Sequence, residues 1–264
     1  MAAAAHENKI EICDLTMAYG SFVVMRNINA KIKRAEIFII MGGSGCGKST
    51  LLRQMIGLKA PAQGDIVYDG EAFWKSGEDE RRKRLRTFGV LFQGGALWSS
   101  MTLAENISLP LGEYTDLGAA DIRDIARLKL ALVGLKGFED YYPAEISGGM
   151  CKRAGLARAL ALDPEVLFFD EPSAGLDPIS SRSLDELILQ LRDSLGATFV
   201  VVTHELASIF TIGDNSVFLD PNTRTMRAQG NPRELLKNST DPYVREFLTR
   251  GESALTSAPP PTPA

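Results

Sequence analysis

The segment Gly42–Ser49 carries the clearest chemistry in the sequence, because it matches the pattern G-x-x-x-x-G-K-[ST] of a loop that binds phosphate groups. Glycines let the backbone curl until successive N–H groups point inward, and a helix that begins at the loop adds partial positive charge. Lys48 would reach the β- and γ-phosphates of ATP, and Ser49 would offer its hydroxyl to Mg²⁺. The predicted phosphate-binding residues are Gly42, Gly43, Ser44, Gly45, Cys46, Gly47, Lys48, Ser49 and Thr50.

An acidic pair, Asp170 and Glu171, directly follows the apolar run Val166–Phe169. A strand of a parallel sheet delivers its carboxyl end to the ligand crevice, so both carboxylates should lie beside the phosphate loop. Asp170 would hold Mg²⁺ through water. Glu171 would orient or deprotonate the attacking water, since phosphoryl transfer needs positioning and charge stabilisation more than covalent chemistry. An acidic surface turn would not explain the apolar run.

Two more polar residues follow apolar runs: Gln93 comes after Phe88–Phe92, and His204 comes after Thr198–Val202. Both should emerge at the same edge of the sheet. A lone histidine is usually structural, but this position favours a contact between His204 and the γ-phosphate. Taken alone, Gln93 is no better than a surface residue.

The elements that position these residues alternate between strands and helices, which predicts an α/β fold with a mostly parallel sheet covered on both faces. Residues 102–160 form a mainly helical insertion, and an amphipathic helix runs from Pro178 to about Leu195. Gly57 should end the helix that starts near Lys48. The predicted strands are Lys9–Leu15, Phe22–Met25, Glu36–Met41, Gly64–Tyr68, Phe88–Phe92, Val166–Phe169, Thr198–Val202 and a last β-rich pair before residue 230.

Length and composition limit the number of domains, the class of binding partner and the cellular compartment. The 264 residues suit one globular domain with a possible subdomain. With 29 basic and 33 acidic residues the net charge is −4, which gives no case for binding nucleic acid. A basic run at residues 81–86 is interpreted as a solvated helix face. Three cysteines without metal-ligand spacing indicate a reducing compartment, and no apolar run is long enough to span a bilayer, so we expect a cytoplasmic chain.

The segment Ile146–Met150 reads Ile-Ser-Gly-Gly-Met and precedes a helix that contains Arg153 and Ala154. It resembles the signature loop of ATP-binding cassette (ABC) proteins. The chain follows that family's order to about residue 238, with an aromatic at Tyr19, the phosphate loop, Gln93, the signature, the acidic strand, the D-loop Ser173–Asp177 and His204. The resemblance implies a P-loop NTPase (RecA-like) core, an N-terminal antiparallel β subdomain and an inserted helical subdomain at about 100–160.

The resemblance also implies roles for the site residues. Tyr19 would stack on adenine, and Gln93 would sense Mg²⁺ and the transport partner. Ser147 and Gly149, with Gly148 at a second helix start, would contact the γ-phosphate of ATP held by another subunit. Asp177 of the D-loop would join that shared site. One phosphate loop and one signature per chain then imply a head-to-tail homodimer with two ATP sites.

The signature departs from the common Leu-Ser-Gly-Gly-Gln pattern at Ile146 and Met150. Ser147 and both glycines are intact, so we expect activity to survive. The segment from Ser147 to Ser180, together with Asp241–Leu248, resembles the ATPase subunits of the lipid-trafficking Mla system and its relatives, which work with MCE-domain proteins. This implies integral permease partners, a periplasmic MCE-domain protein, and a place on the cytoplasmic face of the inner membrane.

Alternatives remain open at this point. The ATPase could energise transport of a small polar solute, or it could be a soluble cassette protein in translation or DNA repair. Residues 243–248 could support the dimer or form a plain capping helix. The predicted division is an ATPase domain at 1–240, a helical extension at 241–252 and a disordered tail at 253–264.

Overall fold

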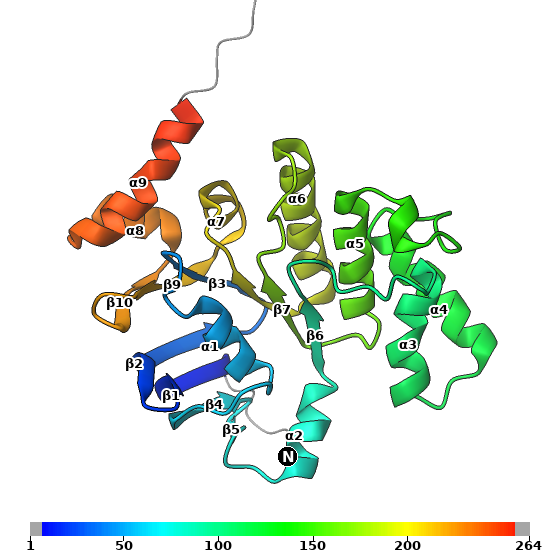
Figure 1. Ribbon diagram of the computed structural model, residues 1–264, viewed down its shortest axis with the longest axis horizontal. Helices are drawn as coiled ribbons and strands as arrows, with labels where there is room; N and C mark the ends of the chain where they lie inside the picture. The colour runs from blue at the N-terminus through cyan, green and yellow to red at the C-terminus, as the bar shows by residue number, and fades with distance from the viewer. Residues whose placement is uncertain (1–6, 257–264) are drawn as a thin grey trace, which may run out of the picture.

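The computed structural model describes residues 7–256 and contains two sheets with helices around them (Figure 1). The strands are β1 (Asn8–Tyr19), β2 (Phe22–Lys33), β3 (Ile37–Gly42), β4 (Gln63–Tyr68), β5 (Glu71–Ala72), β6 (Phe88–Leu91), β7 (Val166–Asp170), β8 (Thr198–Val202), β9 (Asn215–Asp220) and β10 (Thr225–Gly230). The helices are α1 (Lys48–Met55), α2 (Glu78–Leu85), α3 (Leu103–Tyr114), α4 (Ala119–Leu132), α5 (Gly148–Ala159), α6 (Pro178–Leu195), α7 (Leu206–Ile212), α8 (Pro232–Asn238) and α9 (Pro242–Thr256), with a 3₁₀ turn at Pro143–Glu145. Among these described helices, none is long and apolar enough to cross a bilayer.

The larger sheet has the strand order β10-β9-β3-β8-β7-β6. Its strands β9, β3, β8, β7 and β6 run parallel, and β10 pairs antiparallel with β9. The smaller sheet, β2-β1-β4-β5, is antiparallel throughout. The expected α/β architecture with a mostly parallel sheet and an N-terminal antiparallel subdomain is therefore confirmed.

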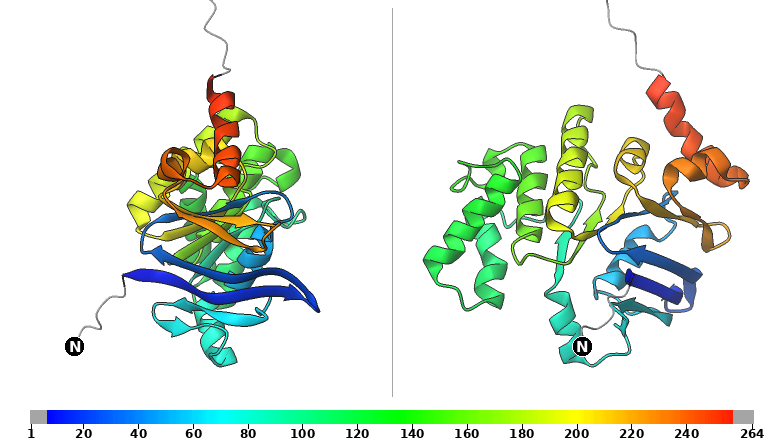
Figure 2. Two further views of the ribbon diagram at one scale, coloured as in Figure 1. Left: turned by 90° about the vertical axis from the view of Figure 1, so that its left-hand side faces the viewer. Right: turned by 180° about the vertical axis from the view of Figure 1, so that it is seen from behind.

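Strand β3 separates two hydrophobic cores because its side chains alternate between the faces of the large sheet. Ile37, Ile39 and Met41 face the core formed with α3–α7 and α9, whereas Phe38 and Ile40 face α1 and the small sheet. All five are fully buried. One face of the large sheet is thus covered by helices, and the other by α1 and a second sheet, as the turned views show (Figure 2).

The first two strands are longer than the sequence pattern predicted. Strand β1 continues past Leu15 to Tyr19, and β2 continues past Met25 to Lys33. Asp14 and Asn27 have positive φ of 45° and 54°, and the pairing register shifts around Asp14. Such a bulge moves the apolar side chains by one position. The alternation therefore breaks in the middle of each strand, which hid the second half.

Helices α3, α4 and α5 form a lobe at one end of the large sheet, within the range predicted to be helical (Figure 1). A reciprocal cap starts α3: the Thr102 side chain accepts from the Glu105 N–H at 3.2 Å, and Glu105 accepts from the Thr102 N–H at 2.8 Å.

At the other end of the chain, helix α9 continues to Thr256, so the predicted end of the helical extension at 252 was too early. The remainder of the predicted tail, residues 257–264, lies outside the described residues.

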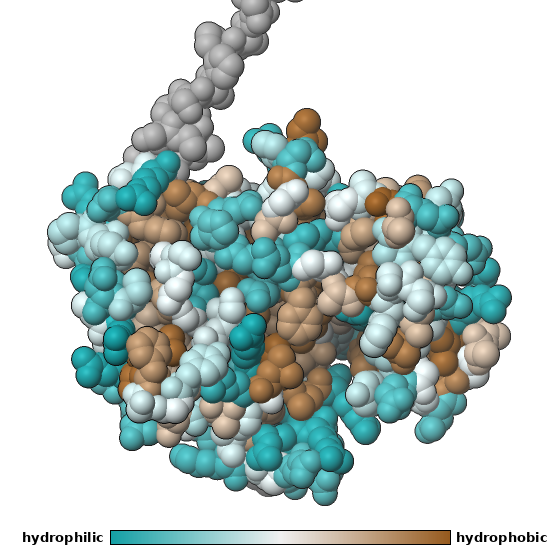
Figure 3. Space-filling view, viewed as in Figure 1, coloured by the Kyte–Doolittle hydropathy of each residue, from teal (hydrophilic) through white to brown (hydrophobic). Residues whose placement is uncertain are grey.

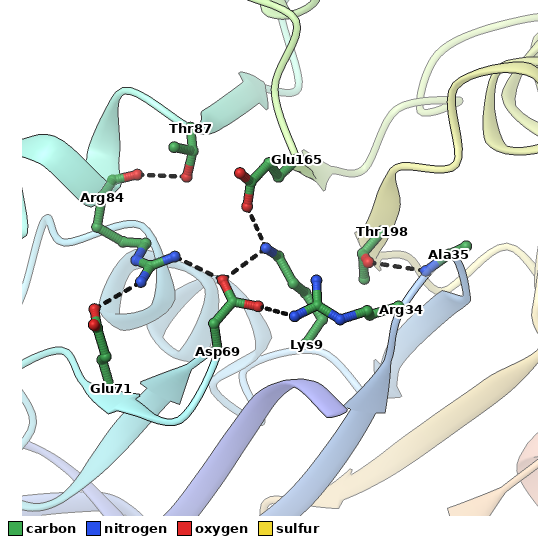
Figure 4. Close-up of polar contacts among 9 residues, drawn as sticks. All are labelled: Lys9, Arg34, Ala35, Asp69, Glu71, Arg84, Thr87, Glu165 and Thr198. Atoms are coloured by element: carbon green, nitrogen blue, oxygen red, sulfur yellow. Dashed lines mark hydrogen bonds and ion pairs between the residues drawn. The ribbon is translucent and has the colours of Figure 1, made fainter. Parts of the chain in front are cut away.

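An ion-pair network around Asp69 joins the small sheet to the large one (Figure 4). Its carboxylate accepts from Lys9 at 2.8 Å, Arg34 at 2.6 Å and Arg84 at 2.7 Å. The Lys9 side chain is 4% exposed and also pairs with Glu165, which precedes β7. Arg84 belongs to the basic run that was interpreted as a solvated face, and this interpretation was wrong for Arg84 because its guanidinium is held by Asp69.

We predict that Asp69→Ala lowers the free energy of unfolding by about 2–4 kcal/mol, because it leaves a buried lysine and two arginines without their shared carboxylate. Chemical denaturation monitored by circular dichroism measures this loss. Glu71→Ala is the control, since the Glu71 side chain is 78% exposed and should change stability by under about 1 kcal/mol. Equal stability of the two variants would contradict the role given to Asp69.

Candidate nucleotide-binding site

The phosphate loop lies between the end of β3 and the start of α1, and its backbone requires glycine at both ends. Gly42 has φ 149°, and a Cβ there would lie 2.4 Å from the carbonyl oxygen of Leu219. Gly47 has φ 92°, and a Cβ there would lie 2.8 Å from Val24. Any side chain at either position would clash, so these glycines allow the loop to curl over the sheet edge.

Lys48 bridges the loop from inside. Its ammonium group donates to the carbonyl oxygens of Gly42 at 2.9 Å and Gly43 at 3.1 Å. Cys46 is 1% exposed, and burial raises the pKa of its thiol. The Cys46 side chain therefore packs as a small apolar group while its neighbours form the loop surface.

Asp170 ends β7 next to the loop, and the Ser49 hydroxyl donates to its carboxylate at 3.3 Å. Burial raises the pKa of Asp170, because the charged form loses hydration there. A hydroxyl and a carboxylate beside a phosphate loop fit Mg²⁺, which usually takes one or two carboxylates and leaves its other positions to phosphates and water. The described residues contain no cluster of three or more acidic, histidine or cysteine side chains that could hold a metal unaided.

Glu171 sits at a strained backbone position, with φ 49°. Its N–H donates to the Val202 carbonyl at 2.8 Å, which anchors it to the end of β8. One carboxylate oxygen, Oε1, lies 2.8 Å from Nδ1 of His204. The other, Oε2, is buried and has no hydrogen-bond partner among the described residues. A buried acceptor left unpaired is suited to bind a water molecule.

The loop and Glu171 line one cleft of about 910 Å³, whereas Asp170 lies behind Ser49 and does not line it. The cleft gathers the predicted residues Tyr19, Gly42–Thr50, Gln93, Glu171 and His204. Tyr19 is 47% exposed at the cleft wall, and the Lys59 ammonium lies 3.9 Å from its ring centroid. The phosphate loop, the carboxylates and an exposed aromatic ring are therefore within reach of a single nucleotide.

The remaining predicted residues lie elsewhere on the chain. Ser147 caps α5, accepting from the Met150 N–H at 3.3 Å, and Gly148 and Gly149 form the first turn of that helix. Asp177 caps α6 and accepts from the N–H groups of Ile179 and Ser180, both at 3.0 Å. None of the four predicted residues Ser147, Gly148, Gly149 and Asp177 lines the cleft of its own chain.

Sequence reasoning missed part of the cleft wall. Helix α9 contributes Tyr243, Phe247 and two charged side chains, and the Tyr243 hydroxyl would lie 3.8 Å from a Cβ built on Gly43. Phe247 packs on Phe218 of β9 with ring centroids 5.0 Å apart. Residues 243–248 thus pack on their own chain, as the capping-helix alternative predicts, and a role in the dimer stays a prediction. The cleft residues that were not predicted to bind nucleotide are Phe22, Val24, Leu206, Tyr243, Glu246, Phe247 and Arg250.

Comparison with known proteins identifies the family. A family model described as "ABC transporter" matches residues 25–174, more than half of the chain. The chain belongs to the ABC transporter family. Its fold is also that of solved ATP-binding cassettes. The cbiO1 protein of Clostridium perfringens superposes with a TM-score of 0.81 at 27% identity, over 95% of this chain and 100% of that one. Dimeric MJ0796 gives 0.76 at 29% identity, over 84% and 98%.

Two groups of curated relatives are similar over most of this chain. The "probable ribonucleotide transport ATP-binding protein mkl" of Mycobacterium tuberculosis is 43% identical over 239 residues, which cover 90% of this chain but only 66% of the relative. The "intermembrane phospholipid transport system ATP-binding protein MlaF" of Haemophilus influenzae is 39% identical, covering 94% and 92%. MlaF of Escherichia coli K12 is 40% identical, covering 91% and 88%.

Helix α7, which follows His204, is joined to α6 by a hydrogen bond to the buried carboxylate of Asp185. Asp185 of α6 is 4% exposed and accepts from the Ser208 hydroxyl of α7 at 2.8 Å. Burial raises the pKa of Asp185 to about 6, and the carboxylates of Glu205 and Glu186 add to this rise. Because the folded pKa lies above the unfolded value, the folded state binds more protons between about pH 4 and 6. Asp185 therefore makes stability fall as pH rises through that window.

We predict that Asp185→Asn raises the free energy of unfolding at pH 7.5 by about 1–3 kcal/mol, because the amide keeps an acceptor for Ser208 without a buried charge. The gain should shrink as pH falls towards 4. Denaturation curves at several pH values measure both effects. Asp116→Asn, at an exposed position away from α6, is the control, and a gain that did not depend on pH would contradict the prediction.

Proposed function

We propose that this chain binds ATP with Mg²⁺ and hydrolyses it as the ATP-binding subunit of a transporter. The observation that carries the proposal is the state of Glu171: one carboxylate oxygen is held by His204, and the other is buried and unpaired in the cleft of the phosphate loop. This is the arrangement that a water-activating carboxylate needs, with its position set by one partner and an acceptor left for the water.

Each residue then has a separate task. The loop N–H groups and the Lys48 ammonium, released from the carbonyls of Gly42 and Gly43, bind the phosphates. Ser49 and Asp170, with Gln93 across the cleft, would hold Mg²⁺, which neutralises charge on the phosphate oxygens. Glu171 accepts a proton from, or orients, the attacking water. His204 keeps the Glu171 side chain in place, and Tyr19 offers its ring face to the base.

A second copy of the chain completes the site in this proposal. Ser147, Gly148, Gly149 and Asp177 lie outside their own cleft, as expected if they meet ATP held by another subunit. A head-to-tail pair with two-fold symmetry would place each signature loop over the other phosphate loop. The similar cassette MJ0796 is dimeric, which supports this assembly.

The cargo in this proposal is phospholipid, moved between membranes with an integral permease and a periplasmic MCE-domain protein. The chain would then be peripheral to the cytoplasmic face of the inner membrane. Support comes from the MlaF relatives, which match over 88–92% of their own length. The mkl relatives favour a second candidate, transport of a polar solute, because their name specifies ribonucleotide. This chain spans only about two thirds of their length, so we rank that candidate second.

A groove between β6, α3 and α5 is our proposed contact for the permease. It has a volume of about 440 Å³ and combines apolar side chains with one cation and one anion. Leu109 is 43% and Tyr114 50% exposed, and the surface is hollowed between the helical lobe and the rest of the chain (Figure 3). The lining residues are Phe88, Gly89, Val90, Leu109, Pro110, Glu113, Tyr114, Arg158, Ala159 and Leu162.

We predict that Glu171→Gln lowers kcat for ATP hydrolysis by about 10²–10⁴-fold while ATP still binds, because the amide cannot take a proton from water. Lys48→Ala should weaken both binding and turnover, since Lys48 acts on phosphate. Steady-state hydrolysis and equilibrium binding of a fluorescent ATP analogue separate the two effects. Near-normal hydrolysis by Glu171→Gln would contradict the role of Glu171 in activating water. Glu186→Gln, which removes an exposed carboxylate outside the cleft, is the matched control.

Purification of the N-terminally tagged chain from native membranes tests the partners. We expect an integral permease, an MCE-domain protein and bound phospholipid to accompany it, identified by mass spectrometry. A permease with a solute-binding protein in their place would support the polar-solute candidate. Ribosomes or DNA without any membrane protein would overturn the transporter proposal and leave the ATPase proposal standing.

A further inference from the structure

Lys152, on the signature helix α5, is a buried cation that the proposed mechanism leaves without a task. It is 7% exposed, and its ammonium donates to the main-chain carbonyl of Glu171 at 3.3 Å. The carboxylates of Glu171 and Glu205 lie near enough to favour its charge, while burial lowers its pKa. A buried charge is costly unless it is paired, so this contact needs a reason.

The carbonyl that Lys152 binds belongs to Glu171, the residue that acts on the attacking water in the proposed mechanism. Glu171 holds a positive φ of 49°, which a non-glycine residue adopts only when its surroundings impose it. Its N–H is fixed by Val202 at 2.8 Å, and its carbonyl also accepts from the Ala174 N–H at 3.2 Å. Lys152 adds a donor from a different element, α5. The orientation of the Glu171 side chain therefore depends partly on where α5 lies.

The N-terminus of helix α5 makes a second contact in the proposed dimer. Ser147 caps the helix, and Lys152 follows five residues later, which corresponds to about 7.5 Å along the axis. In the proposed dimer, Ser147 and the two glycines meet ATP held by the partner subunit. About one and a half turns of helix thus connect Ser147, which faces ATP held by the partner subunit, to Lys152, which contacts Glu171 of its own chain.

We propose that Lys152 is a positioning residue that links the two sites: binding of ATP at the signature loop shifts α5, and Lys152 transmits the shift to Glu171 of the same chain. This inference rests on the proposed function. Lys152 does not touch ATP or the attacking water. It sets the main-chain position from which Glu171 acts, so that one site becomes competent when the other is occupied.

The test compares Lys152→Met, Lys152→Arg and a control in the full-length chain. Lys152→Met keeps the length of the side chain but removes the donor, and we expect kcat to fall about ten-fold with KM for ATP changed less than two-fold. The Hill coefficient for ATP should fall from above 1 in the wild type towards 1. Lys152→Arg restores a donor and should recover at least half of kcat.

Lys129→Met is the control, because Lys129 of α4 is 5% exposed and pairs with Asp163 at 2.5 Å, so it is a buried lysine without a contact to Glu171. It should keep kcat and the Hill coefficient within two-fold of the wild type. Unchanged kcat and cooperativity in Lys152→Met would overturn the inference. So would an equal loss in both methionine variants with matching falls in Tm and no rescue by Lys152→Arg, which would indicate a purely structural role.

A double-mutant cycle tests the link itself. If Lys152 transmits the signature contact, Ser147→Ala should lower kcat far less in the Lys152→Met background than in the wild type. Fully multiplicative losses would overturn the inference. Wild-type hydrolysis reports separately on the proposed function, so a chain that hydrolyses ATP without this coupling loses only the inference about Lys152.

Discussion

The register of three parallel strands determines where the phosphate loop, Glu171 and His204 lie. Ile40 of β3 pairs with Val202 of β8, and Val202 pairs with Asp170 of β7. Because neighbouring strands lie about 4.8 Å apart, the paired residues Ile40, Val202 and Asp170 span about 10 Å across the sheet. The phosphate loop, His204 and Glu171 begin within two residues of that line. A slip by one residue in any strand would turn its buried side chains to the opposite core, so the packing of both cores maintains the site geometry.

Burial in two cores also explains why so much could be predicted. Strands β3, β7 and β8 are apolar over most of their length because both faces are covered, and such runs are easy to recognise in a sequence. The polar residues that end them stand out for the same reason. Gly42–Ser49 was identified from its motif, and Asp170, Glu171, His204 and Gln93 became candidates because each follows an apolar run. Tyr19 needed the family resemblance, since one exposed aromatic carries no signal.

What sequence reasoning missed depends on contacts between segments far apart in the chain. Helix α9 reaches the phosphate loop through packing of Tyr243 and Phe247 on Phe218, and no local pattern specifies which strand an amphipathic helix will cover. Arg84 looked solvated because its partner, Asp69, lies 15 residues away in a turn. The second halves of β1 and β2 were hidden by bulges that reverse the alternation on which strand prediction depends.

The contacts made along α5 show why a single chain is an incomplete description of this site. Its N-terminus, with Ser147 and two glycines, lies outside its own cleft, while Lys152 on the same helix holds the Glu171 carbonyl. Arg158, further along, donates to the carbonyl of Ala96 at 2.7 Å, in the loop that follows Gln93. The helix thus contacts both the loop that follows Gln93 and the main chain of Glu171. One helix therefore connects the partner-facing signature residues with the loops that carry Gln93 and Glu171, which would allow a displacement of α5 to reach both.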